Sequence, residues 1–104
     1  MKGRLRKQQS KFARLLAHLI LYAYDNGYEI TFGDVWAKDG HSKNSLHYDR
    51  LAVDLNLFRD GEYLIKTEAH RELGEYWESL NPDCRRGGSF STVRDGNHYE
   101  ICRP

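Results

Sequence analysis

The residues best suited to chemistry in this chain are two histidines and an aspartate: His47, Asp54 and His98. Imidazole nitrogens and a carboxylate oxygen are ligands that a catalytic zinc ion takes, usually three from the protein with a fourth position open for water. The three side chains can converge if His47 lies beside the strand that carries Asp54 and His98 begins a neighbouring strand. By residue type alone, surface groups or hydrogen-bonded polar contacts explain them as well, so both interpretations stay open.

The segment around Asp54 has the alternation of a half-buried strand. Its apolar face carries alternate residues, namely Leu51, Val53, Leu55 and Leu57. Asp54 is on the opposite face, beside Ala52 and Asn56. Arg59-Asp60-Gly61 then predicts a turn, after which residues 62–65 return as the partner strand of a hairpin.

A helix and a short strand are predicted upstream of this hairpin. Six apolar residues recur at helical spacing: Phe12, Leu15, Leu16, Leu19, Ile20 and Ala23. Asn26-Gly27 then supplies residues that tolerate the left-handed conformation at a helix end. The next apolar residues, Tyr28, Ile30 and Phe32, alternate with polar ones and predict a half-buried strand.

A second amphipathic helix is predicted downstream, with Thr67 as its N-cap and Asn81-Pro82 at its end. Its apolar stripe consists of Leu73, Tyr76, Trp77 and Leu80. Residues 85–91 are expected to form a loop and residues 98–102 a final strand. The layout predicts one α+β domain over residues 1–104, with a small antiparallel sheet and flanking helices.

The overall charge identifies no partner. The 104 residues include 16 Lys and Arg against 15 Asp and Glu, a formal net charge of +1, so no global field favours nucleic acid or an anionic membrane. Six basic residues crowd the first 14 positions: Lys2, Arg4, Arg6, Lys7, Lys11 and Arg14. A solvated helix start is the more ordinary explanation for them than an arm that binds phosphate.

The apolar stretch at positions 13–24 imitates a signal peptide, but it contains His18 and has no convincing small-residue cleavage site before Asp25. It is also too short to span a bilayer, so we expect no membrane insertion. Cys84 and Cys102 could pair, although nothing in the sequence requires it, and we interpret them as free thiols.

Two motifs around the candidate ligands resemble those of one enzyme family. Ser45-x-His47-x-x-Arg50-x-Ala52-x-Asp54 resembles the S-x-H-x-x-G-x-A-x-D motif of zinc D-alanyl-D-alanine carboxypeptidases and phage L-alanyl-D-glutamate endopeptidases. The family's second motif is similar to Asp95-x-x-His98, followed here by Tyr99-Glu100. Similarity to the phage members covers residues 12–101 and includes Ala23-Tyr24-x-Asn26-Gly27-Tyr28, Asp54-Leu-Asn-Leu-Phe58, Gly61-x-Tyr63-Leu64 and Leu73-Gly-Glu-Tyr-Trp77.

The resemblance implies the D-Ala-D-Ala peptidase fold, which hedgehog-type domains share. It implies that His47, Asp54 and His98 bind Zn²⁺ and that Asp95 is the general base. Zinc would polarise the scissile carbonyl and acidify a water, and Asp95 would carry the water's proton to the leaving amine. Simple turn chemistry also fits Asp95.

The resemblance further implies that Ser45 contacts the substrate or a group beside the first ligand, although a plain turn hydroxyl fits equally. The implied substrate is the stem peptide of bacterial peptidoglycan, and the implied setting is phage or prophage lysis by an endolysin. We therefore expect a monomer that is made in the bacterial cytoplasm and acts at the cell wall.

Two positions depart from the family pattern. Arg50 stands where the motif has glycine, and Ala37 stands where many members have an arginine that binds a substrate carboxylate. Lys38 could supply a point charge there, but it cannot reproduce the bidentate fork of arginine. This difference favours an endopeptidase over a carboxypeptidase.

Two other classes of function stay open. A protein of this fold could bind cell-wall peptide without cutting it, and the missing arginine motivates that alternative; an intact Asp95 argues against it. A nucleic-acid binder using the basic first helix would require strongly salt-dependent affinity, and we expect no nucleic-acid partner.

The remaining candidate residues have ordinary structural explanations. We expect His18 at the polar edge of the first helix and solvated side chains at His41 and His70, with His41 close enough to His47 to be a neighbour of the site. Glu75 and Glu78 are expected on a solvated helical face rather than as a paired-carboxylate glycosidase site. Trp77 is expected in the core, and Trp36 either in the core or lining a cleft.

Overall fold

The computed structural model describes residues 2–34, 46–87 and 96–104. Within them the chain forms two α-helices, two short 3₁₀ turns and five strands. In chain order these are α1 (Lys2–Asp25), β1 (Glu29–Phe32), η1 (Leu46–Asp49), β2 (Ala52–Arg59), β3 (Glu62–Leu64), η2 (Thr67–His70), α2 (Arg71–Leu80), β4 (Cys84–Arg86) and β5 (His98–Ile101).

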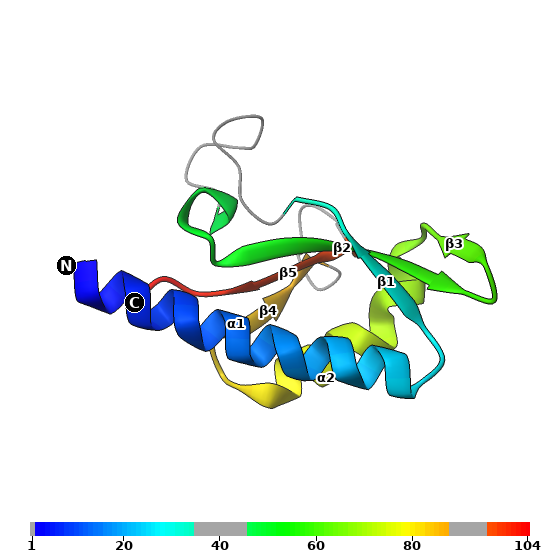
Figure 1. Cartoon of the computed structure of the whole chain (residues 1–104), viewed down its shortest axis with the longest axis horizontal. Helices are drawn as coiled ribbons and strands as arrows, with labels where there is room; N and C mark the ends of the chain where they lie inside the picture. Colours follow the sequence, from blue (N-terminus) through cyan, green and yellow to red (C-terminus); the bar gives the residue numbers. More distant parts are fainter. Residues whose placement is uncertain (1, 35–45, 88–95) are drawn as a thin grey trace.

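The strands form one antiparallel sheet in the order β1-β2-β5-β4, and β3 pairs with the far end of β2 (Figure 1). β2 is the central strand and touches three others. Its carboxyl-terminal half pairs with β1 and β3, and its amino-terminal half pairs with β5. The register sets Asp54 opposite His98.

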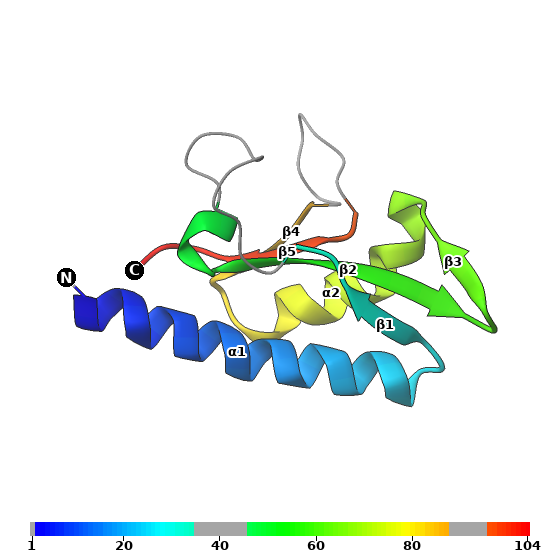
Figure 2. The same cartoon turned by 45° about the horizontal axis from the view of Figure 1, so that its top comes forward.

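Both helices cover the same face of the sheet, and Figure 2 shows α1 running along it. The buried cluster between the layers joins Leu19 of α1 and Trp77 of α2 to Leu55 of β2 and Tyr99 of β5. The predicted α+β class, with a small antiparallel sheet and flanking helices, is thus confirmed. Among the described residues, neither helix is long and apolar enough to cross a membrane.

The local signals that end the first helix and form the hairpin act as predicted. Gly27, two residues after the end of α1, has a φ of +85°, and the Tyr28 amide donates to the Ala23 carbonyl over 3.0 Å. At the β2–β3 turn, Asp60 and Gly61 have φ of +52° and +79°. Two successive positive φ values match a type I′ turn, whose twist suits an antiparallel hairpin.

Three details differ from the expectation. Phe32 is 56% exposed, because β1 is an edge strand. Helix α2 starts at Arg71, after a separate 3₁₀ turn whose N-cap position is Lys66, so Thr67 is not the N-cap of α2. Part of the expected loop at 85–91 is strand, because Cys84–Arg86 pairs with β5.

Cys84 and Cys102 are free thiols, as expected.

Candidate metal centre

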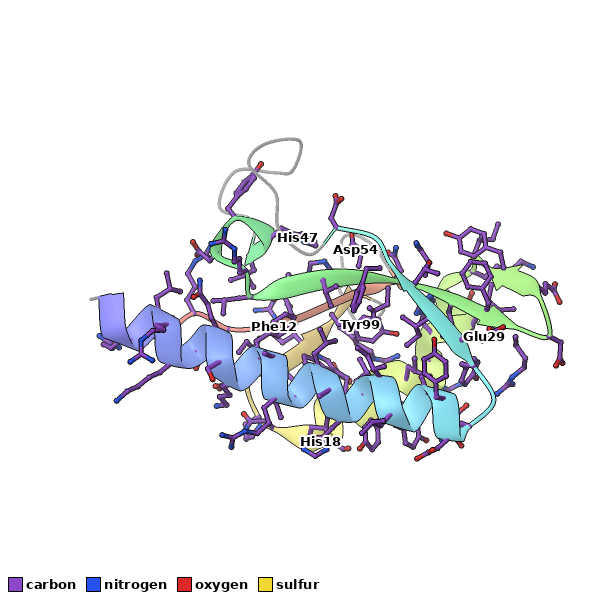
Figure 3. All side chains as sticks on the ribbon, in the orientation of Figure 1. Phe12, His18, Glu29, His47, Asp54 and Tyr99 are labelled. Atoms are coloured by element: carbon purple, nitrogen blue, oxygen red, sulfur yellow. The ribbon has the colours of Figure 1, made fainter. Side chains whose placement is uncertain are left out.

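Three side chains from three separate segments meet on the face of the sheet that the helices leave uncovered. His47 lies in η1, Asp54 in β2, and His98 is the first residue of β5. Figure 3 shows His47 and Asp54 on the side of β2 away from α1, whereas Phe12 lies between the sheet and that helix. Both histidines are buried, and Asp54 is partly exposed.

The potential ligand atoms are close enough to share one ion. Asp54 Oδ1 lies 3.3 Å from His47 Nε2 and 3.2 Å from His98 Nδ1. The two imidazole nitrogens are 3.3 Å apart. All three ligand atoms lie within 4.8 Å of one another. Two imidazole nitrogens and a carboxylate oxygen are a donor set that zinc takes in catalytic sites, so the residues present fit that metal.

The sheet fixes the position of Asp54. Its backbone pairs with His98 on one side, and on the other its amide donates to the Asp34 carbonyl over 2.8 Å. The Gly33 amide donates to the Asp54 carbonyl, also over 2.8 Å. A Cβ at Gly33 would lie 3.2 Å from the Asp54 Cβ, which is closer than ordinary packing. Glycine therefore lets the chain run tightly beside the candidate ligand.

The turn η1 fixes the position of His47. The Arg50 amide donates to the His47 carbonyl over 3.2 Å, and the Leu51 amide donates to the Leu46 carbonyl over 3.0 Å. These two bonds form a Schellman motif, with Arg50 in the left-handed conformation at a φ of +57°. Glycine usually occupies that position, because it has no Cβ to clash. The departure of Arg50 from the resembled motif therefore falls on a position that favours glycine.

Hydrogen bonds also decide the charge of His98. Burial alone would lower its pKa, but hydrogen bonds to Asp54 and Glu100 more than offset this and raise the pKa to about 9. Without a metal, the ring is therefore protonated on both nitrogens and positively charged at neutral pH. A metal ion must displace one of these protons, because only a neutral imidazole can be a ligand.

Sequence reasoning gave no role to Glu100, which the structure places beside the cluster. Its Oε1 lies 2.6 Å from His98 Nε2, and the residue is 6% exposed. A signal was available, because residues two apart on a strand share a face and Glu100 follows His98 at that spacing.

The prediction for His70 was wrong. The residue is 4% exposed rather than solvated, and its Nδ1 lies 2.8 Å from the Tyr99 hydroxyl. Burial lowers its pKa to about 4. Its partner Tyr99 belongs to the core between the sheet and the helices, so His70 is not part of the candidate metal centre. His18 is exposed as expected, and so are Glu75 and Glu78.

Several predicted site residues lie outside the described parts of the chain. They are the proposed base Asp95, the proposed substrate contact Ser45, and Trp36, Ala37, Lys38 and His41. Their roles stay predictions.

The chain has the two-layer α+β fold of a bacterial endopeptidase of known structure. It superposes on the crystal structure of Serratia marcescens L-Ala D-Glu endopeptidase ChiX with a TM-score of 0.74, over 97% of this chain and 85% of that one. The two sequences are 14% identical, so the likeness establishes the fold alone. No family model and no curated protein sequence matches the chain.

Proposed function

We propose that this protein is a zinc-dependent peptidase that hydrolyses an amide bond in the peptidoglycan stem peptide. The observation that carries the proposal is the convergence of His47, Asp54 and His98, with ligand atoms within 4.8 Å of one another. Two further facts support it: the fold is shared with an L-Ala D-Glu endopeptidase, and the motifs around the three residues resemble those of zinc peptidases.

Each residue has a definite task in this proposal. His47, Asp54 and His98 would hold the ion. A bound zinc ion would supply Lewis-acid activation of the scissile carbonyl and of the attacking water. Asp95 accepts the proton of that water and delivers it to the leaving amine. Ser45 contacts the substrate beside His47.

The finer assignments also belong to the proposal. The absence of arginine at Ala37 favours an endopeptidase, because no bidentate partner awaits a terminal carboxylate there. We propose that the protein acts as a monomer at the cell wall during phage or prophage lysis.

The test combines metal content with hydrolysis of purified peptidoglycan. The wild type should bind about one zinc ion per chain, the number that one three-ligand site holds. His47→Ala and Asp54→Asn should lose both zinc and hydrolysis, whereas Asp95→Asn should keep zinc and lose hydrolysis. Glu75→Gln, a change on the exposed face of α2, is the control and should match the wild type in both measurements.

Mass spectrometry of the released fragments identifies the bond that is cut. New amino termini at D-glutamate would support the endopeptidase, and release of terminal D-alanine would instead indicate a carboxypeptidase. A chelator should abolish activity, and added zinc should restore it. Zinc binding with no hydrolysis would favour the non-cutting peptide-binding module, and a wild type without zinc would refute the site.

A further inference from the structure

Glu100 and Arg85 form a charged pair directly behind His98. Glu100 Oε1 lies 2.6 Å from His98 Nε2, and its Oε2 lies 3.3 Å from Arg85 Nε. The other ring nitrogen of His98, Nδ1, faces Asp54 and His47. The imidazole of His98 therefore lies between the other two candidate ligands on one side and the buried carboxylate of Glu100 on the other.

The strand register places this pair. Glu100 follows His98 by two residues on β5, so both side chains lie on the face of the sheet away from the helices. Across the ladders, Glu100 is opposite Ala52 on one side and Arg85 on the other. Ala52 has a small side chain, which leaves room for the carboxylate beside His98.

The backbone beneath the pair is fixed from the core side. Trp77 Nε1 donates to the carbonyl oxygens of both Arg85 and Glu100, each over 3.1 Å. Trp77 is fully buried between α2 and the sheet. The backbone of Arg85 and Glu100 is thus held by the core, and the two side chains meet each other on the face of the sheet away from the helices.

A buried carboxylate is costly unless it is paired and hydrogen-bonded, so the arrangement needs an explanation. When Glu100 accepts a hydrogen bond from Nε2–H, the ring must keep its hydrogen there and present the Nδ1 lone pair to an ion. Such a carboxylate also makes the imidazole a stronger ligand and prevents its rotation. Arg85, whose side chain is 58% exposed, balances the charge from the solvent side.

We propose that Glu100 is a positioning residue that fixes the tautomer and orientation of His98, and that Arg85 holds Glu100 in place. This inference rests on the metal centre of the proposed function. In this arrangement, Glu100 of β5 and Arg85 of β4 support the candidate ligand His98 from the side opposite the metal.

The first test is zinc affinity, measured by competition with a chromophoric chelator. Glu100→Ala should weaken zinc binding by about 10–100-fold, the usual cost of losing such a partner. Glu100→Gln keeps an oxygen that accepts from Nε2–H, so it should lose less affinity than Glu100→Ala. Equal zinc affinity in the wild type and both variants would overturn the proposal.

A substitution at Arg85 tests the proposal with little effect on folding, because its side chain is 58% exposed. Arg85→Met should lower zinc affinity several-fold while the thermal midpoint of the chelator-treated protein stays near the wild-type value. Arg85→Lys should restore most of the affinity, because it returns the charge. The control is Arg71→Met, which removes another exposed arginine whose partner is Glu75.

The NMR signal of the His98 ring separates positioning from a general structural effect. In the zinc-loaded wild type, the Nε2 proton should be shifted downfield and exchange slowly with water. It should move upfield in Glu100→Gln and be lost to exchange in Glu100→Ala. An unchanged signal in folded, zinc-loaded variants would refute the positioning role.

These outcomes distinguish the two proposals. Zinc binding without hydrolysis in the wild type would refute the peptidase, and the affinity series would still decide the role of Glu100. Zinc binding with hydrolysis, together with unaffected Glu100 variants, would refute only the positioning role. A wild type that binds no zinc would overturn both.

Discussion

Arg50 shows how one residue can depart from a motif and still keep the geometry that the motif serves. It occupies the left-handed position that closes the turn carrying His47. For a residue with a Cβ, that conformation costs about 1–2 kcal/mol relative to the right-handed region. The turn and its two hydrogen bonds are formed nonetheless, so the surrounding structure carries the cost.

Two substitutions of Arg50 should therefore separate the cost of the strained backbone from the effect of losing the side chain. Arg50→Gly and Arg50→Ala both remove the side chain, but only glycine adopts this φ without strain. We expect the glycine variant to have a free energy of unfolding about 1 kcal/mol higher than the alanine variant. Urea denaturation of the chelator-treated proteins measures it. Equal stability of the two variants would show that the turn carries no such strain.

At the scale of single residues, the sequence predicted the three candidate ligands only through the resembled motifs. His47, Asp54 and His98 are distant in sequence, and nothing in their spacing alone requires them to meet. Glu100 was missed because its role depends on the rotamer of His98. His70 was wrongly assigned to the surface, since its burial arises from contacts with β5 that local polarity does not reveal.

At the scale of elements, the close approach of β2 to the residues after β1 holds the candidate ligand Asp54 in place. Gly33→Ala would place a methyl group against the Asp54 Cβ and carbonyl oxygen, each 3.2 Å away. Asp54 must then shift by a few tenths of an ångström, and we expect zinc affinity to fall about tenfold.

The matched control for Gly33→Ala is the same substitution at Gly3, where an added Cβ meets nothing within 4 Å. Zinc competition on both variants, with circular dichroism to verify folding, makes the comparison. Equal zinc affinities would show that the tight packing at Gly33 does not support Asp54.

The elements that the sequence predicted are those with a strong period. The apolar stripe of α1 and the alternation of β2 each extend over enough residues to define a buried face. By contrast, β4 has three residues, two of them arginines, and exists because β5 offers it a partner. The 3₁₀ turn before α2 was also missed, because Thr67 and Glu68 match a helix start in composition.

At the scale of the whole molecule, the hydrogen bond between His70 and Tyr99 ties η2 to β5, and the burial of His70 makes stability depend on pH. The pKa of His70 is lowered from 6.5 to about 4 by burial. Between these values the unfolded chain binds a proton that the folded protein does not. The contribution of His70 to stability is therefore fully present above pH 6.5 and is lost as the pH drops toward 4, by about 1.4 kcal/mol per pH unit within that range.

The substitution His70→Asn isolates this contribution. Asparagine can still hydrogen-bond the Tyr99 hydroxyl but does not titrate in this range. We expect the stability difference between wild type and variant to be constant above pH 6.5 and to shrink below it. Urea denaturation at pH 4.5–8 with chelator present measures this difference. The other titrating groups contribute equally to both proteins, so their effects cancel in the difference. A difference that does not vary with pH would contradict the assignment.

The two faces of β2 have a consequence for how such a chain can change over time. Odd-numbered residues from Leu51 to Leu57 are buried against the helices, while Asp54 faces the other way. Because side chains alternate along a strand, inserting one residue before Asp54 would turn the carboxylate inward and expose leucines to water. A single-codon insertion there would thus disrupt the core and the candidate metal centre together. Length variation among descendants of this protein should accumulate between the strands, and inside β2 only in steps of two.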